Sequence, residues 1–201
     1  MRILHLSDTH GKHQLIGDMP PADLIIHSGD LSFAGAPNEV LDFIEWFGGL
    51  NYKYKIFIAG NHDYCLDRKK PERIQHFLPR GCFYLYHSGI TIEGIKFWGV
   101  PFLISDETKG SFDDVVEKIP ADTDVLISHR PPYAILDWSN HTTYGCMSLL
   151  QAVMKIAPRY HLFGHIHDAY GIQKSNATTF ANASLLDEKY QLKNEPFIFE
   201  I

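Results

Sequence analysis

The feature that most constrains this chain of 201 residues is a set of five short apolar runs, each followed at once by Asp, His, Asn or Gly. Runs this short and rich in Ile, Leu and Val predict buried strands. In open α/β sheets, ligand sites lie beyond the carboxyl ends of the strands. The polar clusters are therefore predicted to meet at one site. The runs are Arg2–Leu6, Leu24–Ile26, Lys55–Ala59, Asp124–Ile127 and Tyr160–Phe163.

Helical periodicity lies between these runs, and hairpins are predicted elsewhere. Apolar residues recur at helical spacing in Asn38–Leu50 and Gly145–Ala157, and less clearly in Lys70–Leu78. The residues predict an α/β fold, a four-layer α/β/β/α sandwich of two mixed sheets flanked by helices, formed as a single domain over residues 1–201. The predicted hairpin and terminal strands are Gly89–Ile92, Ile95–Val100, Gly171–Lys174, Thr178–Ala181 and Phe197–Ile201, and the most loop-like stretch is Pro101–Ser111.

The formal net charge of -6 excludes a domain-wide basic surface. We therefore expect no affinity for long nucleic acids, whereas a small phosphorylated substrate needs only a local positive charge, which metal ions supply. The N-terminus becomes polar at Ser7, too early for a signal peptide, and no run reaches the ~20 apolar residues of a membrane span. We expect a cytoplasmic protein without membrane contact; the sequence leaves its oligomeric state open.

The residue types in the clusters are those of a metal centre. Asp8 and His10 are two apart, so on an extended backbone they would face the same way, and His165 and His167 repeat this spacing. Asp30 has two carboxylate oxygens and could bridge ions about 3.5–4 Å apart. The remaining candidate donors are Asn61 and His129.

The charge of such a centre favours hydrolysis of an anionic ester over metal storage. Two divalent ions with Asp8 and Asp30 as their only charged ligands keep about two positive charges for phosphate. Mixed imidazole and carboxylate ligands favour Mn, Fe, Zn or Co over Ca, and we expect two divalent ions, with Mn preferred and Mg as a further candidate.

The set of five clusters, taken in order, resembles the calcineurin-like metallophosphoesterases. The resemblance is carried by Asp8-x-His10, Gly29-Asp30, Gly60-Asn61-His62-Asp63, His129 and Gly164-His165-x-His167. Segments such as Ile58-Ala59-Gly60-Asn61-His62, Leu136-Asp137-Trp138 and Asn182-Ala183-Ser184 are similar to the small metallophosphoesterase-domain-containing, brain-type subgroup. The resemblance implies the metallo-dependent phosphatase fold.

The same resemblance implies roles for individual residues. His62 would face the substrate, stabilise charge on phosphate and protonate the leaving oxygen, while a hydroxide shared by the ions attacks phosphorus in line. Asp63 would either orient His62 or tie down its loop. Arg130 stands where the subgroup usually has glycine, and would contact phosphate or narrow the pocket. The first metal would take Asp8, His10, Asp30 and His167, and the second Asp30, Asn61, His129 and His165.

Three functions compete at this stage. The subgroup resemblance favours a phosphodiesterase acting on small esters such as cyclic nucleotides. The alternatives are a phosphomonoesterase and a nucleotide-binding protein with residual catalysis. Asp30–Gly35 contains no arginine, which weakens a protein-phosphatase activity, because those relatives carry Asp-Arg-Gly after the second cluster. Trp138 is interpreted as a core residue in preference to a wall for a base.

Overall fold

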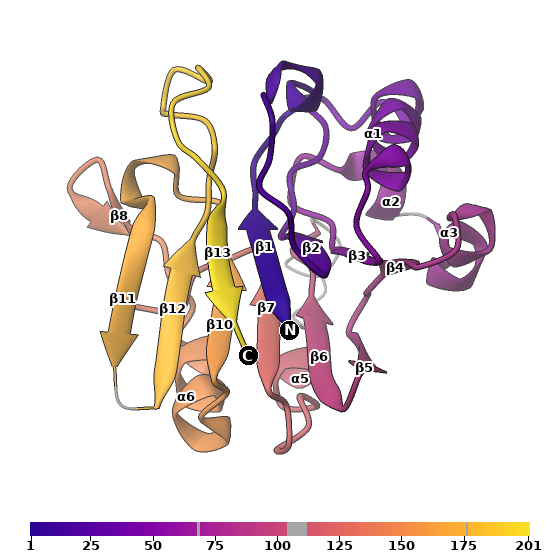
Figure 1. Cartoon of the computed structure of the whole chain (residues 1–201). Helices are drawn as coiled ribbons and strands as arrows, with labels where there is room; N and C mark the ends of the chain where they lie inside the picture. Colours follow the sequence, from indigo (N-terminus) through magenta and orange to yellow (C-terminus); the bar gives the residue numbers. More distant parts are fainter. Residues whose placement is uncertain (68, 104–111, 176) are drawn as a thin grey trace.

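In the computed structural model, which describes residues 1–67, 69–103, 112–175 and 177–201, two large β-sheets pack face to face between helices (Figure 1). Helices α1 (Pro37–Gly49), α2 (Tyr64–Asp67) and α3 (Pro71–Phe77) lie with the N-terminal sheet, and α5 (Phe112–Val116) and α6 (Met147–Ile156) with the other. The predicted four-layer α/β/β/α sandwich is confirmed.

The N-terminal sheet has the strand order β13-β1-β2-β3-β4. Strands β1 to β4 run parallel, and β13 pairs antiparallel with β1. The parallel strands agree with the predicted apolar runs to within two residues, except for β4, which the sequence analysis missed. The strands are β1 (Arg2–Leu6), β2 (Leu24–His27), β3 (Tyr54–Phe57), β4 (Cys82–Tyr84) and β13 (Phe197–Glu200).

The second sheet has the order β11-β12-β10-β7-β6-β5. Its four central strands run parallel, and the edge strands β5 and β11 are antiparallel to their neighbours. Both predicted hairpins are present, one as β5–β6 and one as β11–β12. The strands are β5 (Ser88–Ile92), β6 (Ile95–Val100), β7 (Val125–Ser128), β10 (Tyr160–Phe163), β11 (Gly171–Ser175) and β12 (Thr178–Asn182).

Alternate residues of the parallel strands enter different apolar layers. In β1, Ile3 packs between the two sheets, whereas Leu4 and Leu6 pack toward α1. In β7, Ile127 faces the layer between the sheets and Leu126 the layer under α6. Because these strands are buried on both faces, their sequences are mostly apolar instead of alternating, with single buried polar residues such as His5 in β1 and His161 in β10. This explains why short apolar runs located them.

Local signals set the helix ends. Pro37 begins α1, and the Glu39 carboxylate accepts hydrogen bonds from the backbone N–H groups of Ala34 and Ala36 at 3.0 and 3.2 Å. Helix α6 ends at Ile156; the next residue, Ala157, has φ 51° and precedes Pro158. The predicted helices are therefore shifted by at most two residues.

A small hairpin, β8 (Trp138–Ser139) and β9 (Thr142–Thr143), projects beside the second sheet and was not predicted (Figure 1). The interpretation of Trp138 as a core residue is wrong: its side chain is 58% exposed, because β8 pairs only with β9. The predicted loop Pro101–Ser111 lies outside the described residues from 104 onward. Within the described part of the chain, no helix is long and apolar enough to cross a membrane.

Candidate metal centre

The predicted ligands converge beyond the carboxyl ends of β1, β2, β3, β7 and β10. In Figure 1 the arrows of β1, β12 and β6 point toward this upper edge. Three groups of donor atoms each fall within 4.8 Å of one another among the described residues: Asp8, His10 and His167; Asp30, His129 and His165; and His10, Asp30 and His62, which shares a residue with each of the other two. We call Asp8, His10 and His167 the first ligand group, and Asp30, His129 and His165 the second ligand group.

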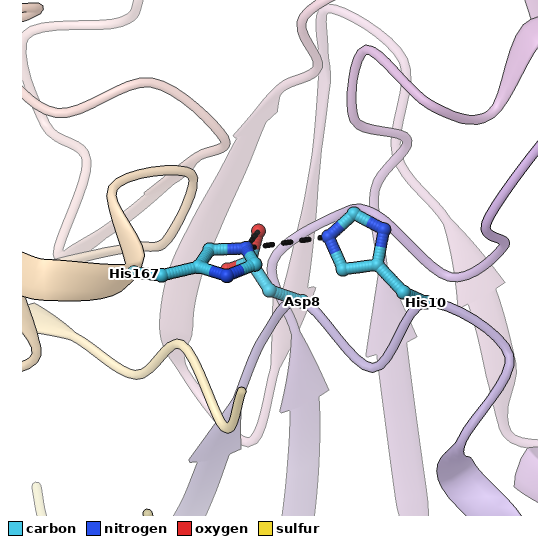
Figure 2. Close-up of side chains that lie close together, drawn as sticks. All are labelled: Asp8, His10 and His167. Atoms are coloured by element: carbon cyan, nitrogen blue, oxygen red, sulfur yellow. Dashed lines mark hydrogen bonds and ion pairs between the residues drawn. The ribbon is translucent and has the colours of Figure 1, made fainter. Parts of the chain in front are cut away.

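The first ligand group joins the loop after β1 to the short helix η2 (His167–Ala169). Figure 2 shows the three side chains pointing toward one another. His167 Nε2 lies 3.3 Å from His10 Nε2 and 3.6 Å from Asp8 Oδ1. Asp8 is fully buried and His10 is 3% exposed, so neither is a surface residue.

The second ligand group joins the loops after β2, β7 and β10. His129 Nε2 lies 3.4 Å from Asp30 Oδ2 and 3.1 Å from Asn61 Oδ1. The ring centroids of His129 and His165 are 5.0 Å apart. Asn61 therefore lies with the second ligand group.

Asp30 lies between the two groups. Its Oδ2 atom is 3.4 Å from His10 Nε2 in the first ligand group and 3.4 Å from His129 Nε2 in the second. Its other oxygen, Oδ1, accepts a hydrogen bond from the backbone N–H of His62 at 2.9 Å. One carboxylate oxygen is thus held by protein while the other faces both groups.

Asp8 is held differently, by groups from the second sheet. Its oxygens accept hydrogen bonds from the backbone N–H of His165 at 3.0–3.1 Å and from the Ser184 hydroxyl at 2.7 Å. Gly164 packs directly against Asp8 Oδ2, where a Cβ atom would collide with that oxygen. Ser184 has no assigned role in the sequence analysis, because nothing local links it to Asp8.

The backbone at the centre corrects one step of the sequence analysis. Asp8 and His10 were expected to face the same way on an extended strand, but their φ angles are 55° and 43°. Asp30 and His165 also have positive φ, 56° and 72°. Such conformations are uncommon for residues other than glycine and cluster at functional sites. The side chains of Asp8 and His10 converge because the chain turns there.

Backbone carbonyls set the orientation of three imidazole rings. The Nδ1–H groups of His129, His167 and His62 donate to the carbonyls of Ser28, Asp187 and Phe33 at 2.9, 2.9 and 2.7 Å. When such a ring is neutral, its proton is on Nδ1, and the lone pair of Nε2 is available to a metal or a substrate.

Burial and neighbouring charge give the histidines of the metal-free site different pKa values. Burial alone lowers the pKa of a histidine, but the charge of Asp30 raises that of His129 to about 9, and Asp8 does the same for His167. Burial dominates elsewhere, and lowers the pKa of His10 to about 4 and of His165 to about 3. Each ligand group thus pairs one carboxylate with one protonated and one neutral imidazole near pH 7.

His62 and Asp63 have different surroundings. The His62 ring contacts His10 edge-on at 4.7 Å and lies at the open side of the centre. The fully buried Asp63 carboxylate accepts hydrogen bonds from the N–H groups of Leu31, Ser32 and Gly60 and from the Ser32 hydroxyl. Burial and then Asp30 raise its pKa to about 6. Of the two roles weighed for Asp63, these contacts match tying down the loop; the Phe33 carbonyl orients His62.

Arg130 lies beside the second ligand group. Its guanidinium stacks over Phe102 at 4.7 Å, and Phe102 in turn contacts the rings of His129 and His165. Its Nη2 atom is 3.5 Å from the carbonyl of Tyr144. The stacking directs a positive charge to the edge of the predicted centre.

The donor set fits divalent metal ions. Ligands about 2.0–2.2 Å from one ion, at angles near those of a tetrahedron or octahedron, lie roughly 3–3.5 Å from each other. The N···O and N···N separations of 3.1–3.6 Å at the centre agree with this spacing. Mixed imidazole, amide and carboxylate donors suit Mn, Fe, Zn or Co.

Comparisons with known proteins point to the same chemistry. A family model described as calcineurin-like phosphoesterase matches residues 1–169. Metallophosphoesterase domain-containing protein 1 of Homo sapiens is 36% identical over 231 residues, covering 100% of this chain and 71% of that protein. UPF0046 protein C25E10.12 of Caenorhabditis elegans is 32% identical over 227 residues, covering 100% and 81%.

A solved crystal structure supports the fold. It is only 11% identical, but it covers 99% of this chain and 98% of its own, with a TM-score of 0.63. The family match spans the five clusters that build the centre, and the relatives align with the whole chain. The chain therefore belongs to the calcineurin-like metallophosphoesterases, whose members hydrolyse phosphate esters with bound metal.

Proposed function

We propose that this metallophosphoesterase cleaves small phosphodiesters, with cyclic nucleotides as candidate substrates, at a centre of two divalent metal ions, preferably manganese. The observation that carries the proposal is Asp30 Oδ2, which lies 3.4 Å from His10 Nε2 and 3.4 Å from His129 Nε2. An oxygen shared between two imidazoles in this way is suited to bridge two ions. The first ion would bind Asp8, His10, Asp30 and His167, and the second Asp30, Asn61, His129 and His165.

The carboxylates beside the centre support a diester over a monoester. The centre itself attracts either ester, because two divalent ions with Asp8 and Asp30 leave about two positive charges. A cavity of 240 Å³ beside His165 and His167 has carboxylates but no lysine or arginine among its described lining residues. These carboxylates repel additional negative charge, which favours the singly charged diester over the doubly charged monoester. They are Asp168 and Glu188.

The protein's own residues then have distinct tasks. When bound, the two ions would polarise the phosphate and supply the nucleophile. His62, with Nδ1–H held by the Phe33 carbonyl, would in its imidazolium form donate the Nε2 proton to the leaving oxygen and remain as the neutral ring. Arg130 would contact a phosphate oxygen. Asp63 would hold the loop that carries His62 through its four hydrogen-bonded groups.

The test compares hydrolysis of bis(p-nitrophenyl) phosphate and p-nitrophenyl phosphate by metal-stripped protein, with and without added manganese. We expect manganese-dependent cleavage of the diester at a higher kcat/KM than that of the monoester. Cleavage of the monoester alone would replace the proposal with the phosphomonoesterase alternative. No cleavage of either ester with two bound ions would favour the nucleotide-binding alternative.

A further inference from the structure

A buried threonine and a buried histidine lie behind the turns that carry the predicted metal ligands, in the apolar layer under α1. His27 ends strand β2 and is fully buried, with its ring 4.9 Å from that of Phe43. Thr9 is 1% exposed, and its Oγ1 atom lies 3.0 Å from His27 Nε2. We call Thr9 and His27 the threonine–histidine pair. The proposed mechanism gives neither residue a task.

The contacts of His27 fix the position of its proton. Its Nδ1 atom accepts a hydrogen bond from the backbone N–H of Gly29 at 3.3 Å, and a backbone N–H can only donate. In the neutral ring the proton is therefore on Nε2, which donates to Thr9 Oγ1, and the Thr9 hydroxyl donates to the Leu31 carbonyl at 3.5 Å. Burial lowers the pKa of His27 to about 3, so the ring is neutral at pH 7. Every polar side-chain atom of the pair thus has a partner.

The pair links two turns whose backbone is strained. Thr9 stands between Asp8 and His10, whose φ angles are 55° and 43°. Through its Nδ1 atom, His27 holds the residue directly before Asp30, whose φ angle is 56°. Such conformations persist only when the surrounding structure holds them. Backbone hydrogen bonds already join the two turns, and the pair adds a side-chain link from the interior.

Two other buried strand histidines show what is particular to this pair. The Nε2 atoms of His5 and His161 lie 2.9 Å from Ser28 Oγ and 2.7 Å from Ser128 Oγ. In the described part of the chain, the Nδ1 atoms of both histidines have no hydrogen-bond partner. Each of them therefore binds one turn through its side chain, whereas His27 binds two.

We propose that Thr9 and His27 are positioning residues of the metal centre, whose hydrogen bond holds the turn of the first ligand group at the spacing that its ion requires. The inference rests on the proposed two-ion centre and gives the pair no contact with substrate. Groups that support metal ligands typically contribute about 10- to 100-fold in metal affinity. Because His27 also holds the turn of Asp30, loss of its ring should affect both ions, whereas loss of the Thr9 hydroxyl should affect one.

The test is a manganese titration of metal-stripped protein by calorimetry. Thr9→Val nearly keeps the shape of the side chain and removes the hydroxyl. It should weaken one ion by about 10- to 100-fold and leave the other within about threefold. Thr9→Ser restores the hydroxyl and should restore the affinity. His27→Leu removes both hydrogen bonds of the ring and should weaken both ions.

Thr178→Val is the matched control. Thr178 is 5% exposed, and its hydroxyl donates to the Pro158 carbonyl at 2.7 Å at the start of β12, the end away from the centre (Figure 1). This variant should unfold at a lower temperature and keep both manganese affinities.

Three results would overturn the inference. Thr9→Val could lower the unfolding temperature with both affinities unchanged, which would make the pair merely structural. Thr178→Val could lose as much affinity as Thr9→Val, which would make the loss general. Unaltered protein that binds fewer than two ions would overturn the two-ion centre together with the inference. Because the titration needs no substrate, its result is separate from that of the hydrolysis test.

Discussion

The two ligand groups have the same composition, one carboxylate and two imidazoles, yet their carboxylates are held in opposite ways. Asp8 is hydrogen bonded through both oxygens to the second sheet, by the N–H of His165 and the hydroxyl of Ser184. Asp30 has one oxygen fixed by the N–H of His62 and the other directed at both groups. Asp8 is therefore suited to serve one ion and Asp30 to serve two.

The largest effect is expected from Asp30→Asn. Loss of the charge shared by both ions should lower the metal content to below one ion per chain and reduce kcat/KM for the diester by more than about 1,000-fold, since the ions supply several kcal/mol of charge stabilisation. Metal analysis and steady-state kinetics measure both. Asp8→Asn is the matched comparison: it should retain one ion. Equal metal loss in the two variants would contradict the distinction between the carboxylates.

His62→Ala should lower turnover without changing the metal content. Its ring borders both groups but is oriented by Phe33, so its removal leaves the predicted ligands in place. We expect kcat to fall by about 100-fold, within the range of general acid catalysis, at unchanged metal content. The loss should be smaller for an ester with a good leaving group, such as p-nitrophenolate, than for one with an alkyl alcohol. Equal losses for both would argue against proton donation.

Ser184→Ala should weaken metal binding only at the first ligand group. The hydroxyl holds Asp8 Oδ2 at 2.7 Å, and groups that support metal ligands typically contribute 10- to 100-fold in metal affinity. We expect a loss of about that size for one of the two ions in a manganese titration. Ser88→Ala, in the edge strand β5, is the control and should bind both ions normally. Weaker binding of both ions would indicate general damage.

The smallest expected effect is the release of protons when metal binds, and it should be equal for the two ligand groups. In the metal-free protein, Asp30 and Asp8 raise the pKa values of His129 and His167 to about 9, so both rings are protonated at pH 7. Because a histidine binds metal only when neutral, loading should release about two protons at pH 7. Release from the two rings should vanish, and metal affinity should rise, as the pH passes through about 9, which leaves only the proton lost by a water that becomes the bound hydroxide. Calorimetry in buffers of different ionisation enthalpy gives the count; no release at pH 7 would refute it.

The sequence predicted the parts of the centre that depend on local order along the chain. Each of these ligands follows a strand buried on both faces, and such strands have a mostly apolar pattern: Asp8, Asp30, Asn61, His129 and His165. Parallel pairing then brings their ends together, which the apolar pattern predicts without any knowledge of contacts.

Other parts depend on contacts between distant segments and had no local signal. Ser184 binds Asp8 across 176 positions of the chain, and Tyr190 reaches His10 from the loop after β12. The positive φ angles of Asp8 and His10 likewise depend on backbone bonds to the next loop, such as that from His10 N–H to the Asp30 carbonyl at 3.0 Å. For this reason the extended backbone expected there was wrong.

The most direct test of the bridging role of Asp30 is anomalous X-ray diffraction from crystals of the manganese-loaded protein. Two peaks about 3.5–4 Å apart are expected, with Asp30 contacting both and Asp8 contacting only one. A single peak, or two peaks that share Asp8 and not Asp30, would contradict the account.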